Sequence, residues 1–384
     1  MIYLDNSATS WPKPPEVKEA IVRFLDEVGA NPGRSGHLLS VEAARILYET
    51  REALSLLFHA RDPLRIVFTL NATESLNLAL KGLLKSGDHV ITSSMEHNSV
   101  MRPLRALEKT GLELSVTLCS GQGLLDPEDV KRAIRPNTRL IVLNHASNVT
   151  GTLLPVREVG RIAREHDLLF LVDAAQTAGA YPIDVEEDRI DLLAFTGHKS
   201  LYGPQGTGGL VIGDRVNELR INPLKQGGTG SRSEFEEQPD FLPDRFESGT
   251  PNGVGIAGLW AGVRFVLGRG IETIRQHEMN LAGTLLDGLG KMKGIKLYGS
   301  QAMGSRVATV SFLIGDVSSS EAAMRLEREF GILCRSGLHC APAAHRTIGT
   351  FPNGTVRFSL GAFTTEEEIL AALRAVSHLS GSSN

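Results

Sequence analysis

Two polar residues in the middle of the chain each follow a short apolar run, where a strand would deliver them to a turn. Lys199 comes after the run 191–196 and belongs to a turn rich in Gly, Pro and Thr at 197–209. A lysine whose pKa is lowered by burial or by a cationic neighbour becomes a nucleophile toward carbonyl compounds. Most lysines are instead solvated on the surface, so Lys199 alone does not decide between a catalytic and a surface role.

Asp173 ends another apolar run, 168–172, and small residues follow it. Pyridoxal phosphate (PLP) is an aldehyde cofactor that bonds to a lysine, and it needs an acid near its pyridine nitrogen because the protonated ring is the electron sink. Asp173 alone could equally be a helix N-cap or a turn residue. An acid at one strand end combined with a lysine after a later strand is rarer, and this combination predicts a PLP site.

The composition is that of an ordinary globular protein. The 384 residues suffice for a large core and two structural domains. A net charge of −4 gives no indication of a nucleic-acid or membrane partner. Three cysteines are too few for a disulfide framework, and residues 1–6 lack the basic and apolar regions of a secretion signal. We therefore expect a cytoplasmic protein.

Strand-like and helix-like segments alternate from residue 65 onward, which predicts an α/β fold with a mainly parallel sheet between helices. A further strand over 208–213 is expected to return along the sheet. The other predicted strands are 66–69, 89–92, 114–118, 140–144, 168–173 and 191–196. Ligands bind at the carboxyl ends of parallel strands, and the polar motifs of this chain follow such ends.

The remaining segments predict a second, smaller α+β domain at the carboxyl end. Helices are expected at 16–25 and 41–58, and a helix over 257–266 leads to a strand at 307–313 and a helix at 320–330. We expect a large cofactor-binding domain over 16–259. Residues 1–15 and 260–384 are expected to form the small domain.

Two further segments follow predicted strands and open helices. Thr73 lies in the segment NATES at 71–75, where backbone N–H groups and the hydroxyl could seat a phosphate, although Thr73 could also be a simple N-cap. His97 lies beyond the strand 89–92, where an imidazole could stack on a pyridine ring and move protons. A lone histidine is more often structural.

The three cysteines have different surroundings. Cys119 and Cys334 lie in strand-like runs and are interpreted as small buried hydrophobic residues. Cys340 lies in a loop beside basic groups, where a thiolate nucleophile could form. His339 and His345 are close to it, but the spacing is not that of a zinc site, so no metal is expected.

Arg357 lies in an apolar run, where an unpaired charge would be costly, so it needs a carboxylate partner. A bidentate arginine suits the carboxylate of an amino acid, and an internal ion pair is the alternative. In the following segment, Thr364 or Thr365 is expected to cap the final helix, with Glu367 or Glu368 completing a capping box.

These motifs together resemble a known family. The segments VDAAQ at 172–176 and TGHK at 196–199 resemble the class V aminotransferase family of PLP enzymes, and within it the cysteine desulfurase and selenocysteine lyase group. The segment RSGLHC at 335–340 resembles the short Cys loop of the desulfurases. The resemblance extends over nearly the whole chain. It implies PLP fold-type I, with PLP as the cofactor.

The resemblance also implies roles for individual residues. Lys199 would be the Schiff-base lysine, and Lys199, Cys340 and His97 would be catalytic. The cofactor-binding residues implied are Thr73, Glu74, His97, Asn148, Asp173, Gln176, Thr196, His198, Lys199 and Thr250. Of these, Asp173 would face the pyridine nitrogen, Gln176 and Asn148 the phenolic oxygen, and Thr73, Thr196 and His198 the phosphate. The substrate-binding residues implied are Arg357, Asn148, Arg34 and His37.

Two positions depart from the family pattern. Asn98 and Leu338 stand where many relatives have histidine, so the roles of those neighbours are open. The family further implies a homodimer with shared active sites, in which Thr250 reaches the phosphate bound by the partner subunit.

The expected function is that of a cysteine desulfurase, which converts L-cysteine to L-alanine and leaves a persulfide on Cys340. A selenocysteine lyase acting on L-selenocysteine, another class V PLP aminotransferase or lyase, and a non-enzymatic scaffold or sulfur-carrier binder are the alternatives. A sulfur-acceptor protein is a possible further partner. The sequence does not name that acceptor or the preferred chalcogen.

Overall fold

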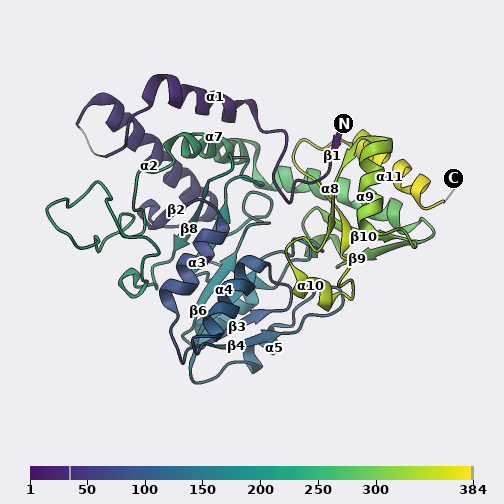
Figure 1. Ribbon diagram of the computed structural model, residues 1–384, viewed down its shortest axis with the longest axis horizontal. Coiled ribbons are helices and arrows are strands. Elements are labelled where there is room, and N and C mark those ends of the chain that lie inside the picture. Colours follow the sequence, from purple (N-terminus) through teal and green to yellow (C-terminus); the bar gives the residue numbers. More distant parts are fainter. Residues whose placement is uncertain (34–35, 382–384) are drawn as a thin grey trace.

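The larger sheet of the computed structural model, which describes residues 1–33 and 36–381, has seven strands. Its order is β2-β8-β7-β6-β5-β3-β4 (Figure 1). The strands are β2 Ile66–Thr69, β3 His89–Ser93, β4 Glu113–Thr117, β5 Thr138–Asn144, β6 Leu169–Asp173, β7 Leu192–Thr196 and β8 Gly208–Ile212. All neighbouring pairs are parallel except those of β8, which runs opposite to β2 and β7. The predicted mainly parallel sheet with a returning strand is confirmed.

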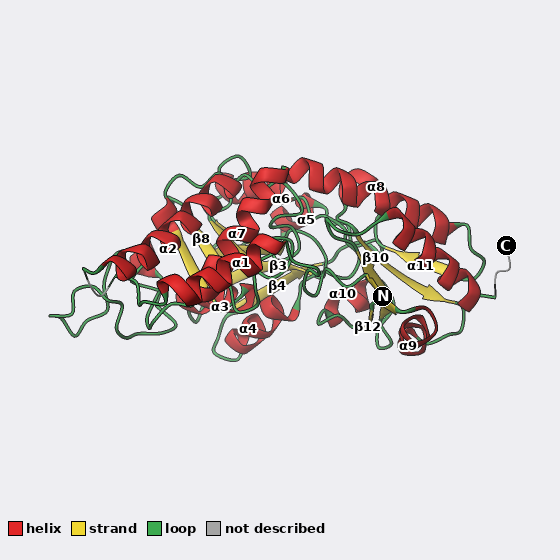
Figure 2. Ribbon diagram, turned by 90° about the horizontal axis from the view of Figure 1, so that it is seen from above, coloured by secondary structure: helices red, strands yellow, loops and turns green. Residues whose placement is uncertain are grey.

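Helices cover both faces of this sheet. They are α1 Pro15–Arg23, α2 Leu38–Phe58, α3 Ala72–Leu83, α4 Asn98–Glu108, α5 Pro127–Arg132, α6 Val156–Glu165 and α7 Gly253–Arg269, with short turns of helix at η1 Phe24–Val28, η2 Pro63–Arg65 and η3 Glu218–Arg220. One apolar cluster joins α2, α5, α6 and α7 to one face, and another joins α3 and α4 to the opposite face. The view from above in Figure 2 shows these layers.

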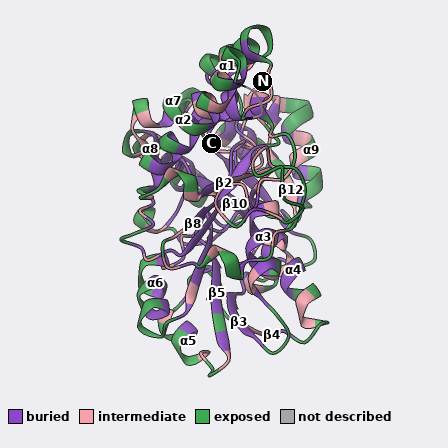
Figure 3. Cartoon of the chain, turned by 90° about the vertical axis from the view of Figure 1, so that its left-hand side faces the viewer, coloured by how far each residue is buried: buried purple, intermediate pink, exposed green. Residues whose placement is uncertain are grey.

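The strands are apolar along their whole length because both of their faces are covered. In β5, Ile141 and Leu143 belong to the cluster under α6, whereas Leu140 and Val142 belong to the cluster under α3 and α4. Figure 3 shows the strands buried between helices whose outer faces are exposed. A two-sided core explains why the sequence shows continuous apolar runs instead of alternation.

The carboxyl-terminal part contains a four-stranded antiparallel sheet of order β12-β13-β10-β9. Its elements are α8 Ile271–Gly290, β9 Ile295–Tyr298, η4 Met303–Ser305, β10 Thr309–Ile314, α9 Ser319–Phe330, β11 Ile332–Leu333, β12 Arg335–Gly337, α10 Pro342–Thr347, β13 Thr355–Ser359 and α11 Glu366–Leu379. β1 Ile2–Tyr3 pairs in parallel with β11, so the amino terminus lies beside this part of the chain (Figure 1). The predicted smaller α+β part is thereby confirmed.

The connection between the two parts is formed by α7 and α8. The two helices meet at Gly270, whose φ of 82° is a conformation that favours glycine. Figure 2 shows α8 running from the larger sheet toward the smaller one. The predicted boundary between 259 and 260 falls inside α7, and the residue limits of the domains stay a prediction.

Among the described residues, no single helix is long and apolar enough to cross a bilayer. The pair α7 and α8 meets the length and composition test only when the two are taken together, and this pair is bent by 80° at its break.

Candidate active site

A cavity of about 320 Å³ lies at the carboxyl ends of β5, β6 and β7, beside the smaller sheet. It is lined by Ser7, Ala8, Asn71, Ala72, Thr73, His97, Ser99, Asn144, Ala146, Asn148, Asp173, Ala175, Gln176, Thr196, His198, Lys199, Arg335, His339, Cys340 and Arg357. Most of the residues predicted to bind a cofactor or substrate are thus brought together. They come from the turns that follow the parallel strands and from the Cys loop of the carboxyl-terminal part.

Lys199 lies in the turn after β7 and its side chain is mostly buried. Burial lowers the pKa of Lys199 to about 8; the carboxylate of Asp173 opposes this effect and the charge of Arg357 adds to it. The turn is fixed from the amino-terminal segment, because the Ser10 hydroxyl donates to the Lys199 carbonyl at 2.8 Å. Lys199 is therefore held in one place and has a larger neutral fraction at neutral pH than a solvated lysine, as a carbonyl nucleophile requires.

Asp173 ends β6 and is 5% exposed. Its Oδ1 accepts the Ala175 backbone N–H at 2.9 Å. Burial raises the pKa of this carboxyl group, while the Ala175 hydrogen bond and the charge of Lys199 oppose the rise. A cationic partner such as a protonated pyridine nitrogen would stabilise the buried carboxylate. Beside it, the Gln176 side-chain amide donates to the Ser7 carbonyl at 3.2 Å.

One end of the cavity is suited to an anion. α3 begins here, and its N-cap Asn71 accepts from the Glu74 N–H, while Ala72 and Thr73 of the first turn line the cavity. First-turn N–H groups lack intrahelical acceptors and lie at the positive end of the helix dipole. Thr196 Oγ1 and His198 Nδ1 are buried without a hydrogen-bond partner in the described residues. A phosphate would supply the missing partners.

His97 lines the cavity and also forms the N-cap of α4. Its Nδ1 accepts the Ser99 backbone N–H at 3.0 Å, so the proton of the neutral ring lies on Nε2. Burial lowers the pKa of His97 to about 4, and the charge of Lys199 contributes to this shift. His97 is thus a neutral imidazole at neutral pH, and its structural capping role coexists with its position at the cavity.

Arg357 lies on β13 and is 2% exposed. Its Nη2 forms an ion pair with Asp5 at 2.6 Å, and its Nη1 donates to the Asn148 carbonyl at 2.9 Å. The internal ion pair considered from the sequence therefore exists, and the Nε–H group is still without an acceptor among the described residues. Arg335 lies opposite Arg357 in the β12–β13 register and lines the same cavity.

Asn148 connects the large sheet to the Cys loop. Its Nδ2 donates to the His339 carbonyl at 2.6 Å, and its Oδ1 is buried without a described partner. On the other side of the loop, the Asn98 backbone N–H donates to the Cys340 carbonyl at 2.8 Å. Asn98 stands where many relatives have histidine. This hydrogen bond uses only the backbone of residue 98, so it does not depend on which side chain is present there.

Cys340 is exposed and lines the cavity. His339 and Cys340 have φ angles of 48° and 58°, a left-handed conformation that costs a non-glycine residue about 1 kcal/mol or more. The hydrogen bonds from Asn148 and Asn98 hold the loop in this conformation. The exposed thiol is thus presented at the cavity by a constrained loop.

The other two cysteines are poor nucleophiles. Cys119 lies two residues past β4 and Cys334 between β11 and β12, so both fall just outside the strands in which they were expected. Both are partly buried, and burial raises the pKa of Cys119 to about 11 and that of Cys334 to about 12. A thiol with a raised pKa holds little thiolate at neutral pH.

Several predicted site residues are not brought to this cavity. Glu74 accepts from the Leu70 N–H and pairs with Lys225 at 2.9 Å, and Thr250 is exposed beside a separate pocket of about 100 Å³. His37 forms the N-cap of α2. Arg34 lies outside the described residues. The described chain also contains no group of three His, Cys, Asp or Glu side chains arranged to hold a metal ion.

Sequence reasoning missed other residues that line the cavity, among them Ser7, Asn144 and Arg335. For Arg335 a signal existed, since it opens the segment RSGLHC that carries Cys340. Ser7 and Asn144 carried no comparable signal. Ser7 reaches the cavity only because the amino-terminal segment packs beside β13, where its N–H donates to Ser359 Oγ at 2.8 Å.

Comparisons with known proteins agree with the geometry. The chain is 35% identical over 373 residues to a probable cysteine desulfurase of Methanothermobacter thermautotrophicus, covering 96% of this chain and 92% of the relative. It is 34% identical to the cysteine desulfurase IscS of Vibrio campbellii, covering 98% and 91%. The apo structure of a cysteine desulfurase from Thermococcus onnurineus NA1 matches with a TM-score of 0.92 and 34% identity, covering 100% of this chain and 95% of that one.

The family described as aminotransferase class-V matches residues 2–371, nearly the entire sequence. Its members are PLP enzymes. This match, the relatives and the arrangement of Lys199 and Asp173 at neighbouring strand ends agree with one another. The chain belongs to the class V aminotransferase family, in which its relatives are cysteine desulfurases.

Proposed function

We propose that this protein is a PLP-dependent cysteine desulfurase, which converts L-cysteine to L-alanine and accepts the substrate sulfur on Cys340. The observation that carries the proposal is that Lys199, Arg357 and Cys340 line one cavity although they come from three separate segments. The relatives and the structural neighbour are named cysteine desulfurases, so a selenocysteine lyase is not favoured.

The residues of the cavity fit PLP. The first turn of α3 with Thr196 and His198 would hold the phosphate, and Asp173 would face the pyridine nitrogen. Lys199 would bond to the cofactor, and Gln176 and Asn148 would lie at its phenolic oxygen. When bound, PLP supplies an electron sink for bond changes at the α and β carbons of an amino acid. The support is that Thr196 Oγ1 and His198 Nδ1, both buried, lack partners that an anion would provide.

The substrate would be held by its carboxylate. Arg357 Nε and Asn148 are the groups placed for this contact, because the Arg357 fork is otherwise engaged by Asp5 and a backbone carbonyl. Lys199 Nζ would then take the proton from the substrate Cα. Its pKa near 8 keeps part of the amine neutral at neutral pH, as a general base requires.

Cys340 would perform the sulfur transfer. Its thiolate attacks the substrate sulfur, so an S–S bond forms on the enzyme as the substrate Cβ–S bond breaks. The electron pair of the broken bond stays with the carbon skeleton, which is protonated and leaves as alanine. The net change is cysteine plus enzyme thiol giving alanine plus enzyme persulfide.

We also propose a homodimer with shared sites. Thr250 is exposed and lies outside the candidate site of its own chain, which fits a contact across a subunit interface. The outer face of α2 exposes Leu38, Val41, Tyr48 and Leu56 by 45% to 86%, more apolar surface than a solvated helix needs. A persulfide on an exposed cysteine further suits transfer to an acceptor protein. A cytoplasmic location, where thiols stay reduced, is part of the proposal.

The test measures alanine formed from L-cysteine and from L-selenocysteine by the PLP-loaded protein, with a reductant present. We expect Cys340→Ala to lose the cysteine reaction and keep the selenocysteine reaction, because selenium leaves without a thiolate acceptor. Cys334→Ala is the matched control and is expected to keep both reactions. Equal alanine formation from cysteine by the wild type and Cys340→Ala, or none by either, would contradict the proposal.

A second measurement distinguishes a desulfurase from a non-enzymatic scaffold and from an aminotransferase. A purified protein that stays colourless after addition of PLP would favour a scaffold without a cofactor. A protein that binds PLP and transfers an amino group to a 2-oxo acid at the same rate with and without Cys340 would favour an aminotransferase.

A further inference from the structure

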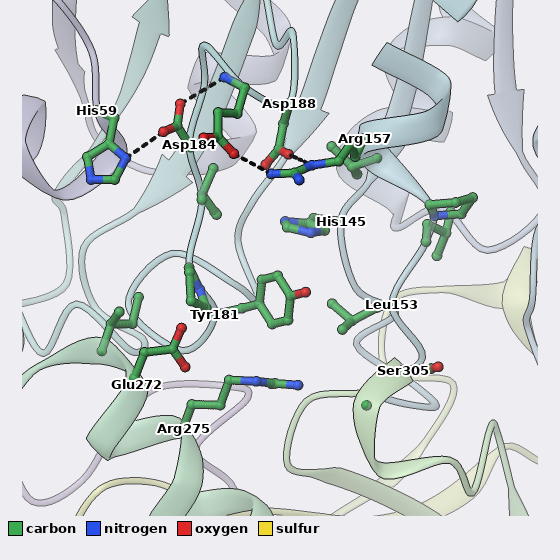
Figure 4. Close-up of a pocket in the computed structure, with 18 of the residues that line it drawn as sticks. His59, His145, Leu153, Arg157, Tyr181, Asp184, Asp188, Glu272, Arg275 and Ser305 are labelled. Atoms are coloured by element: carbon green, nitrogen blue, oxygen red, sulfur yellow. Dashed lines mark hydrogen bonds and ion pairs between the residues drawn. The ribbon is translucent and has the colours of Figure 1, made fainter. Parts of the chain in front are cut away.

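A second and larger cavity, of about 980 Å³, lies between the larger sheet and the start of α8, and none of its lining residues lines the candidate active site (Figure 4). Its apolar walls come from the end of α2, the loops at 124–125 and 153–156, and the junction of α7 with α8. The polar residues that line it include His145, Tyr181 and Arg275 at one end and Arg157, Asp184 and Asp188 at the other. The proposed reaction uses none of these residues.

His145 projects into this cavity from the residue after β5 (Figure 4). It is 5% exposed, and its ring packs edge-on against Tyr181 with centroids 5.2 Å apart. Its Nδ1 is buried without a hydrogen-bond partner in the part of the chain that the structure describes. A buried polar atom without a partner is costly, so a group that bonds to this ring would be stabilising.

Arg275 lies below Tyr181 in the same view. Its guanidinium covers the Tyr181 ring at 4.5 Å, and its Nη1 donates to the Arg306 carbonyl at 3.1 Å. No ion pair joins Arg275 to a carboxylate within 4.0 Å among the described residues. It is therefore a half-buried cation that contacts a ring and a carbonyl, and the carboxylates of Glu272 and Glu278 act on its charge only from beyond ion-pair distance.

Arg157, at the opposite end of the cavity, differs from Arg275 because it forms close ion pairs with carboxylates. It pairs with Asp188 at 2.9 Å and with Glu187 at 2.7 Å. Asp184 at that end binds His59 at 2.7 Å and accepts backbone N–H groups. The charges of that end thus form close ion pairs with one another, whereas Arg275 forms none within the described residues.

Two hydroxyl groups also line the cavity, that of Tyr181 above Arg275 and that of Ser305 across the cavity from it (Figure 4). Neither makes a side-chain hydrogen bond within the described residues. Apolar surface from Leu153 and Ile271 adjoins them. Glu158 and Glu272 are exposed, and Glu272 lies beside Arg275 (Figure 4).

We propose that this cavity binds a small organic monocarboxylate with an apolar body. The carboxylate pairs with Arg275 and accepts from the Tyr181 hydroxyl, and the body packs between Leu153 and Ile271. Charge-assisted hydrogen bonds to a half-buried arginine supply the orientation, and apolar contact supplies most of the affinity. The exposed carboxylates of Glu158 and Glu272 disfavour a second anionic group. This site is independent of the proposed desulfurase reaction.

The test is calorimetric titration of the PLP-loaded protein with 3-phenylpropionate as the probe. We expect one site per chain. The neutral amide, 3-phenylpropionamide, is expected to bind at least tenfold more weakly because it lacks the charge that Arg275 recognises. Phenylsuccinate is expected to bind more weakly than 3-phenylpropionate because its second carboxylate meets Glu158 and Glu272.

Variants locate the site. Arg275→Gln is expected to weaken binding at least tenfold, whereas Arg269→Gln, an exposed arginine on the same helical junction that does not line the cavity, leaves it unchanged. Glu272→Gln is expected to strengthen binding. Tyr181→Phe keeps the ring that contacts His145 and is expected to weaken binding severalfold, which tests the site even if Arg275→Gln folds poorly.

Three outcomes would overturn the proposal. They are no binding at millimolar probe, equal binding by the wild type and Arg275→Gln, and loss of binding in Arg357→Gln with full binding in Arg275→Gln. The last result would place the probe in the candidate active site instead.

Discussion

Arg357 and Asp5 form an ion pair, Nη2 to Oδ1 at 2.6 Å, although 352 positions separate them in the sequence. The pair exists because β1 adds to β11, which brings the amino-terminal segment beside β13. Burial lowers the pKa of Arg357, and the Asp5 carboxylate opposes this effect. The arginine is thus kept charged and oriented before any substrate carboxylate arrives, with Nε still without a partner among the described residues.

A first prediction concerns Arg357→Lys. Lysine keeps the charge but loses the planar fork, so it cannot hold Asp5, the Asn148 carbonyl and a substrate carboxylate at once. We expect kcat/KM for L-cysteine to fall roughly 30- to 100-fold, which corresponds to about 2 to 3 kcal/mol. Steady-state alanine formation measures this. Arg325→Lys, on the outer face of α9, is the control, and a change below twofold in Arg357→Lys would contradict the carboxylate role.

A second prediction concerns the pH dependence of stability in the PLP-free protein. The pKa of Lys199 is about 8 in the folded chain and about 10.5 when unfolded, so the unfolded state binds more protons between these values. The free energy of unfolding contributed by Lys199 therefore rises with pH across that window. Below pH 8 the lysine carries its full burial penalty.

Lys199→Met removes this dependence. At pH 7 the variant is expected to be more stable than the wild type by roughly 2 to 3 kcal/mol, and the difference should shrink as the pH approaches 10. Urea denaturation at pH 7, 8, 9 and 10 measures it. Lys81→Met, on the exposed side of α3, is the control and should show no such trend. A difference that is constant with pH would contradict the lowered pKa.

A third prediction concerns Glu96, a fully buried carboxyl group next to His97. Its oxygens accept from the Asn144 backbone N–H at 2.9 and 3.1 Å, and Ser93 Oγ lies 2.5 Å away. Burial raises the pKa of Glu96 to about 8, so the folded state binds more protons than the unfolded state between about 4.5 and 8. Stability from this group is present at low pH and is lost as the pH rises through 8.

Glu96→Gln mimics the protonated acid. We expect its stability at pH 5 to lie within about 1 kcal/mol of the wild type and to exceed the wild type at pH 8.5. Glu96→Ala leaves the Asn144 backbone N–H without an acceptor and opens a void, so it is expected to be less stable than Glu96→Gln by about 2 to 4 kcal/mol at both pH values. Urea denaturation of the PLP-free proteins distinguishes the two. Equal losses in both variants would show that Glu96 is ionised in the folded state.

A fourth prediction concerns the cap of α11. The Thr365 hydroxyl accepts the Glu368 N–H at 3.3 Å, and the Glu368 carboxylate accepts the Thr365 N–H at 3.0 Å. Thr365→Ala is expected to reduce the free energy of unfolding by about 1 kcal/mol. Thr284→Ala, inside α8, is the control and should leave stability unchanged or slightly higher. A loss as large in Thr284→Ala would exclude capping as the cause.

Local patterns in the sequence determined much of the framework. The apolar runs predicted the strands that became β2, β5 and β7, because strands buried on both faces need continuous apolar side chains. The spacing of Thr365 and Glu368 predicted the capping box, because it depends on residues three positions apart. Lys199 and Asp173 were recognisable because each lies at the end of such a strand or in the turn that follows it.

Only the tertiary structure decided which distant side chains meet. Asp5 reaches Arg357, and Asn148 reaches the Cys340 loop, through strand pairings that no local period encodes. The same packing leaves Thr250 outside the cavity of its own chain and creates the separate cavity under His145. Local propensities act over a few residues, whereas contacts between remote segments depend on how all the strands and helices pack together.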